Sequence, residues 1–195
     1  MFTLLLAIPG LCAAPDGVLH YASGTTVDGT VALDGMHILS GQHLHTPAGR
    51  LSELLTRGST LRLLGGTNLE FDGDSANLIE GGVALNTANQ FVVRCGCASV
   101  IPSNAAKARY LVQLEQKTVF VTAEEAEVSV KSRKKSKTVP AGKTVAVLCG
   151  TAAQDIVFAG GNIPVNVMAG SVAASAVAGP VLNWKLNVSA ASPDR

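Results

Sequence analysis

The hydrophobic residues between Gly41 and Val93 follow the two-residue period of β-strands. Leu61 and Leu63, for example, stand on either side of Arg62. Because successive side chains of a strand point to opposite faces, this alternation predicts strands that bury one face. Glycines separate the runs about every eight residues, a spacing typical of short strands joined by tight corners.

The same alternation continues on both sides of this stretch. It predicts a first strand over residues 27–33 that turns at Asp34-Gly35. Further strands are predicted near residues 91–97, 110–114, 118–122, 126–131 and 143–149. We expect the core to take the apolar member of each alternating pair, namely Val31, Leu61, Leu63, Leu69, Phe71, Leu78, Val83, Leu85, Val112, Val128 and Val145.

These elements predict an all-β fold with a single domain over residues 27–150. Corner glycines favour a β-solenoid-like coil, whereas Asp34-Gly35 and a charged hairpin near Lys134 favour the antiparallel pairs of a β-sandwich. We expect a compact stack that is solenoid-like in its middle and hairpin-like at its C-terminal end. Helix is expected almost only at the two termini.

The order of these parts resembles the FecR domain family. The resemblance rests on a Gly-x-x-Leu-x-Thr entry (Gly41, Leu44, Thr46), a Gly-Ser pair before a strand (Gly58, Ser59), an Asn-x-x-Phe strand (Asn68, Phe71) and a Gly-Gly-x-x-x strand (Gly81 to Leu85). It extends over residues 27–147, roughly two thirds of the chain. These motifs are glycine and apolar spacings, and none of them is a catalytic signature.

The resemblance implies an exported all-β domain that is associated with cell-surface signalling. FecR regulators resemble anti-sigma factors at their cytoplasmic N-terminus, whereas this chain opens directly with an apolar segment and has no room for that helical part. The resemblance therefore implies a FecR-like domain in the same compartment, without the N-terminal anti-sigma part.

The first 14 residues form an apolar run that ends in small residues before Pro15. This pattern is typical of a short signal peptide cleaved after Ala14, although the run lacks a Lys or Arg. The alternative is an N-terminal core strand. Residues 15–26 are then a polar lead-in, and the domain is expected in the periplasm or on the outer face of the membrane.

A hydrophobic C-terminal segment over residues 156–184 contains no charged residue and is followed by a short tail, 185–195. Within it, residues 164–182 are about long enough to cross a bilayer as a transmembrane helix. Gly170, Ala174 and Ala178 would line one side of that helix as a packing stripe. Because leucine is nearly absent, a secreted or amphiphilic tail is the alternative.

Three cysteines, Cys95, Cys97 and Cys149, lie within the domain. In an oxidising compartment, either Cys95 or Cys97 can form a disulfide with Cys149 from a neighbouring strand. Plain buried thiols are the alternative. A metal site would need a fourth ligand, and none has a usable spacing.

Composition narrows the function further. The net charge is +1 and only 15% of residues are charged, which disfavours a nucleic-acid partner. Aromatic residues, at 4%, are few for stacking on sugars or single strands. The sequence contains no catalytic or cofactor motif, and His43 and His45 form only half of a metal site. We therefore expect no enzyme activity, no cofactor and no metal, and we identify no small-molecule substrate.

The sequence thus predicts a non-enzymatic, exported, FecR-like domain that binds a protein partner and relays a signal in the bacterial cell envelope. An exposed strand edge is the expected contact, and the C-terminal segment is a candidate membrane tether. A structural envelope protein and a carbohydrate-binding β-domain without a signalling role are the alternatives.

Overall fold

The computed structural model describes residues 16–104, 107–132, 135–149 and 156–158, and this part of the chain is all-β, as expected. The strands of its first half are β1 (Gly17–His20), β2 (Thr26–Val27), β3 (Thr30–Val31), β4 (Met36–Ile38), β5 (Gln42–Thr46), β6 (Ser52–Thr56), β7 (Ser59–Leu63), β8 (Thr67–Phe71) and β9 (Ser75–Thr87). Those of its second half are β10 (Val92–Cys95), β11 (Ala98–Pro102), β12 (Ala108–Glu115), β13 (Thr118–Glu125), β14 (Val128–Ser132), β15 (Ser136–Val139), β16 (Thr144–Leu148) and β17 (Ile156–Phe158).

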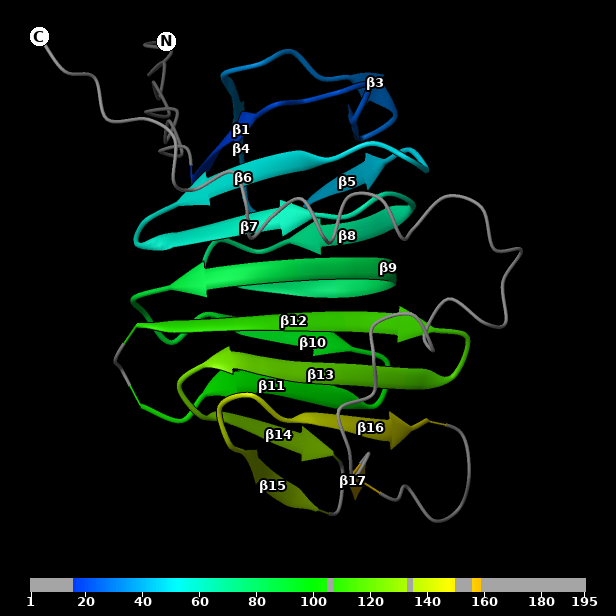
Figure 1. The fold of residues 1–195 in the computed structure, drawn as a ribbon. Coiled ribbons are helices and arrows are strands. Elements are labelled where there is room, and N and C mark those ends of the chain that lie inside the picture. The colour runs from blue at the N-terminus through cyan, green and yellow to red at the C-terminus, as the bar shows by residue number, and fades with distance from the viewer. Residues whose placement is uncertain (1–15, 105–106, 133–134, 150–155, 159–195) are drawn as a thin grey trace, which may run out of the picture.

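The strands form two stacked layers that share β9 (Figure 1). One layer has the order β4-β1-β6-β7-β9-β12-β13-β16-β17. The other has the order β3-β2-β5-β8-β9-β10-β11-β14-β15. The first half of β9 pairs with β8 and β10, and its second half pairs with β7 and β12, so this strand links the layers.

The strand pairing is that of a sandwich. In the described ranges every neighbouring pair is antiparallel except β9 with β10. The middle of the chain does pass between the two layers, as a coil would. However, β5, β6, β7 and β8 pair antiparallel with their neighbours, whereas a coil requires parallel pairing. Most of the regularly spaced glycines lie in turns between strands, where Gly58 and Gly73, for example, have positive φ, and Gly81-Gly82 lies inside β9. Such turns need glycine as much as coil corners do.

The core lies between the two layers. All the residues that we expected in it are buried except Val31, and Phe71 and Tyr110 are the largest fully buried side chains. Among the described residues, Oγ of the partly buried Ser103 is buried without a partner, whereas the hydroxyl groups of the buried serines and threonines are hydrogen-bonded. The Thr46 hydroxyl, for instance, lies 2.8 Å from that of Ser52. In the middle strands, the alternation of apolar and polar residues in the sequence thus predicts correctly which side chains are buried.

The prediction for Val31 was wrong, because the first hairpin turns earlier than expected. Asp28 and Gly29 have φ values of 49° and 80° and form the two-residue loop between β2 and β3. Beyond this loop Val31 and Leu33 are 65% and 75% exposed, whereas Ala32 is buried. The turn thus lies six residues before the predicted Asp34-Gly35 position.

The segment expected to be a polar lead-in contains a strand. β1 lies between β4 and β6, and its Leu19 is fully buried. The described β-structure therefore begins at Gly17 and not at Val27. Only Val18 and Leu19 are large apolar residues in β1, a run too short for its periodicity to be recognised.

Both predicted terminal segments lie wholly or mostly outside the described residues. The outside part includes the expected signal peptide (1–14), the stripe of Gly170, Ala174 and Ala178, and the tail. The first three residues of the hydrophobic segment, Ile156–Phe158, form strand β17 beside β16. Over the residues that the structure describes, we find no helix with the length and apolar character needed to span a bilayer.

Candidate functional site

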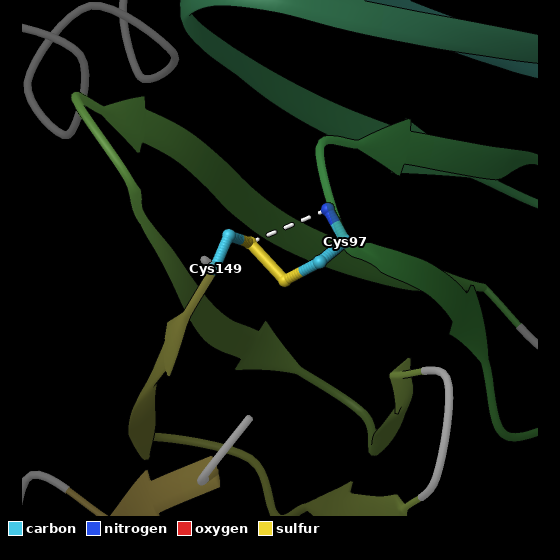
Figure 2. The surroundings of a disulfide bond; sticks show 2 residues. All are labelled: Cys97 and Cys149. Carbon is cyan, nitrogen blue, oxygen red and sulfur yellow. Dashed lines mark hydrogen bonds between the residues drawn. A yellow bond between two sulfur atoms is a disulfide. The ribbon is translucent and has the colours of Figure 1, made fainter. Parts of the chain in front are cut away.

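A disulfide between Cys97 and Cys149 ties the two layers together (Figure 2). Cys97 lies in the turn between β10 and β11, and Cys149 follows the last residue of β16 in the other layer. Their Cα atoms are 5.4 Å apart, and the bond spans a sequence separation of 52. The amide N–H of Cys97 also donates a hydrogen bond of 3.3 Å to Sγ of Cys149. The bond therefore fixes the position of β16 relative to β10.

Local geometry explains which of the two neighbouring cysteines is paired. Cys95 ends β10 with its side chain fully buried in the core. Gly96 then adopts a left-handed conformation, and a Cβ placed on it would lie 3.5 Å from Sγ of Cys149. This turn presents Cys97 to Cys149, so the structure contains the second of the two pairings that the sequence left open. Burial raises the pKa of the Cys95 thiol to about 12.

A polar groove of about 440 Å³ lies where several turns meet, and Asp16, Asp72 and Asp74 line it. Ser40 connects two of these carboxylates. Its N–H donates to Asp16 Oδ2 (3.2 Å), and its hydroxyl donates to Asp72 Oδ1 (2.7 Å). The carboxylates thus hold the β4–β5 turn against the β8–β9 turn. In the described ranges, no group of three or more His, Cys, Asp or Glu side chains could hold a metal ion.

The two histidines considered as half of a metal site are exposed on β5. His43 lies opposite Glu70 and His45 lies opposite Asn68 on β8. The backbone N–H of His43 donates to Asp28 Oδ1 (2.9 Å), and this bond is the main reason why the pKa of Asp28 lies below its usual value. These contacts hold the β2–β3 turn against β5.

Four of the six exposed large apolar side chains in the described part of the chain lie at one end of the sandwich. The six are Tyr21, Val31, Leu33, Leu39, Ile79 and Leu148. The first four come from the segment that contains β3 and β4, which are the last strands of their layers at this end (Figure 1). Sequence reasoning missed this surface because it placed Val31 in the core. The Asp28-Gly29 pair was the signal that could have revealed it.

Comparisons with known proteins find a partial likeness of fold. No protein-family model matches the chain, and no curated protein matches it. Two crystal structures of a "putative anti-sigma factor" from Parabacteroides distasonis ATCC 8503 are similar to it. The sequence identities are 20% and 19%, and the TM-scores are 0.49 and 0.48. Each match covers 59% of this chain and 57% of the other, so the match spans little more than half the length of that protein.

Proposed function

We propose that this chain is an exported, non-enzymatic, FecR-like domain that binds another protein in the bacterial cell envelope and relays a signal through that contact. The edge strands of the sandwich carry the proposal. Among the described residues, β3 and β4 at one end, and β15 and β17 at the other, each have a partner strand on one side only. An unpaired strand edge exposes backbone donors and acceptors that can bind a strand of another protein. The motifs between Gly41 and Leu85 support the family resemblance.

The disulfide supports the proposed compartment. Disulfides form and persist in oxidising environments such as the bacterial periplasm, and they are rare in the cytosol. The Cys97–Cys149 bond and the apolar residues 1–14 both favour export through a signal peptide. Within the hydrophobic segment 156–184, we propose residues 164–182 as the tether of the domain to the membrane, as their length and lack of charge suggest.

Isolation of the protein from the bacterial envelope tests this function. The full chain, with an affinity tag placed after Arg195, would be crosslinked in intact cells and purified from the membrane fraction. We expect the mature N-terminus to be Pro15 and one envelope protein to be captured in a stoichiometric amount, with reciprocal capture when that protein carries the tag.

A tagged chain with a Gly81→Ala substitution, which we expect to destabilise the fold, serves as the control for non-specific capture. If the wild-type chain is found in the envelope without a stoichiometric partner, the relay function is wrong and a structural role replaces it. If the chain retains Met1 and stays in the cytoplasm, the proposed export is wrong.

A further inference from the structure

We propose that the sandwich lies against the bilayer through a basic surface, formed by Lys117, Lys131 and Lys135, which binds the phosphate groups of anionic lipid headgroups. This inference rests on the proposed membrane tether, residues 164–182. It adds which part of the domain meets the membrane and what chemistry holds it there.

The disulfide brings turns of both layers together at the basic surface. Lys117 lies in the turn between β12 and β13, and its carbonyl oxygen accepts a hydrogen bond of 2.6 Å from the N–H of Cys149. Cys149 is bonded in turn to Cys97, which lies between β10 and β11 of the other layer (Figure 2). These links fix the Lys117 backbone close to the β10–β11 turn.

The β14–β15 hairpin adds two lysines to the same place. Its turn starts at Ser132, which lies opposite Ala98, the first residue of β11. Lys131 precedes Ser132, and the backbone of Lys135 closes the turn through two hydrogen bonds with that of Ser132 (2.8 and 3.3 Å). Lys117, Lys131 and Lys135 are all exposed. Three exposed cations thus come from turns that meet at one edge of the sandwich.

Charge is distributed unevenly along the sandwich. Residues 128–154 contain six lysines and arginines and no acidic residue. Of the acidic residues near the lysines in sequence, Glu115 is only partly exposed, and Glu127 lies at the other end of β14. At the far end of the molecule, residues 16–49 contain three aspartates and no lysine or arginine. An anionic surface therefore attracts one end of the domain and repels the other, which determines its orientation.

The proposed tether places a bilayer near the basic end. In Figure 1, β14, β15, β16 and β17 lie together at the end of the sandwich opposite to β3 and β4. β17 ends at Phe158, and residues 159–163 separate it from Pro164, where the tether begins. The chain from Phe158 to Pro164 spans at most about 22 Å. The end that carries the basic surface is therefore the one within reach of the headgroups.

Lysine at this place suits the phosphate groups of a lipid surface. Anionic lipids give a bilayer a negative potential, which attracts lysine and arginine within about one Debye length, roughly 8 to 10 Å. Each cation held at such a surface strengthens binding by about fivefold. Because the ammonium group is a point charge on a flexible stem, it can follow mobile headgroups and needs no shaped pocket.

Lysine labelling of the full chain tests this arrangement. The chain would be reconstituted into nanodiscs of phosphatidylcholine, with or without phosphatidylglycerol, and treated with an amine-reactive reagent before mass spectrometry. We expect labelling of Lys117, Lys131 and Lys135 to fall by about fivefold when the anionic lipid is present, and to recover at high salt. Lys107 is the internal control, because it is exposed at the other end of β12 from Lys117, and its labelling should change by less than about twofold.

A charge reversal provides a second measurement. Lys135→Glu should reduce the protection of Lys131 by anionic lipid to less than about twofold, because it replaces attraction with repulsion. Lys107→Glu makes the same change away from the basic surface, and Lys131 should stay protected. Thermal melting of both variants shows whether they are folded, and the comparison of lipids in the wild-type chain needs no substitution.

The proposal is wrong if anionic lipid leaves the three lysines as reactive as phosphatidylcholine does, or if it protects Lys107 equally. It is also wrong if inorganic phosphate, added to phosphatidylcholine nanodiscs, gives the same protection, because a free anion is then sufficient. Protection in native envelope membranes but not in anionic nanodiscs overturns it as well, since an acidic protein then covers the surface.

Carbonate extraction separates this proposal from the proposed function. If the full chain resists extraction from native membranes and its lysines stay unprotected, the basic surface is wrong and the tether stands. If carbonate at high pH releases the chain, the tether is wrong. Flotation of the full chain with anionic vesicles, and its loss in Lys135→Glu, would then still support the basic surface, whereas no flotation overturns it. Capture of a protein partner is measured independently of both.

Discussion

At the scale of single residues, Phe71 shows how much one side chain contributes to this thin sandwich. It is fully buried on β8, opposite Gln42 and Ala76 on the adjacent strands. We expect Phe71→Ala to lower the free energy of unfolding by about 3 to 5 kcal/mol in urea titrations, because it leaves a cavity in the core. Ile79→Ala, at a 46% exposed position, should change it by less than about 0.5 kcal/mol. Equal effects would contradict the assignment of Phe71 to the core.

Cys95 makes a prediction about pH. Its pKa rises from 9.0 to about 12 on folding because its thiol is buried. The stability that it contributes is therefore complete below about pH 9 and is lost as the pH rises towards 12. We expect the wild-type chain to lose more stability than Cys95→Ala between pH 8 and pH 10.5, with Cys12→Ser in both backgrounds. The same pH dependence in both chains would show that the thiol is accessible to water.

At the scale of the strands, β9 can serve both layers because it bends at Gly81-Gly82. Gly81 has a φ of 82°, and a Cβ on it would lie 2.6 Å from the carbonyl oxygen of Gly66. Thr67 also holds the bend, since its hydroxyl donates to the oxygen of Gly82 (2.7 Å) and accepts from the N–H of Gly82 (3.0 Å). The bend thus depends on a position that only glycine fits.

Gly81→Ala should lower the free energy of unfolding by about 3 kcal/mol or more, because left-handed strain and a backbone clash add together. Gly41→Ala is the control. Gly41 also has a positive φ (86°), but nothing lies within 4 Å of its added Cβ, so the loss should be about 1 to 2 kcal/mol. Chemical denaturation followed by circular dichroism measures both, and an equal loss would refute the close approach at Gly81.

The strands themselves show what the sequence could predict. The alternation of apolar and polar residues identified the buried face of β7 and β8, because successive side chains point to opposite faces of any sheet, whatever the direction of its strands. It could not identify the direction of pairing, since a coil and a hairpin stack show the same alternation and the same turn glycines. β1 was missed because it is short, and the exposed face of β3 was missed because Asp28-Gly29 was not recognised as a hairpin loop. The edge strands that we propose for the partner therefore became visible only in the folded chain.

At the scale of the whole molecule, the disulfide stabilises the sandwich between two distant parts of the chain. A bond that spans 52 residues removes enough entropy from the unfolded chain to contribute about 4 kcal/mol. We expect the double variant Cys97→Ala, Cys149→Ala to lose about this much in urea titrations, whereas Cys95→Ala keeps the bond. Mass measurement without reductant verifies the bond in each chain. A loss below about 1 kcal/mol would mean that the disulfide adds little stability beyond the strand contacts that already bring Cys97 and Cys149 together.

The same bond determines how the domain responds to a pulling force. If tension is applied to the chain beyond Cys149, the covalent path runs from Cys149 to Cys97 and enters the sandwich at β10. The strands from β11 to β16 lie between the two cysteines in sequence, so tension cannot extend this section beyond the span of the closed loop. The force reaches β10 directly, where β9 and β11 hold it from both sides. Under tension applied from the C-terminal side, the section from Cys97 to Cys149 is therefore a short, inextensible part of the chain, and it becomes extensible when the bond is reduced.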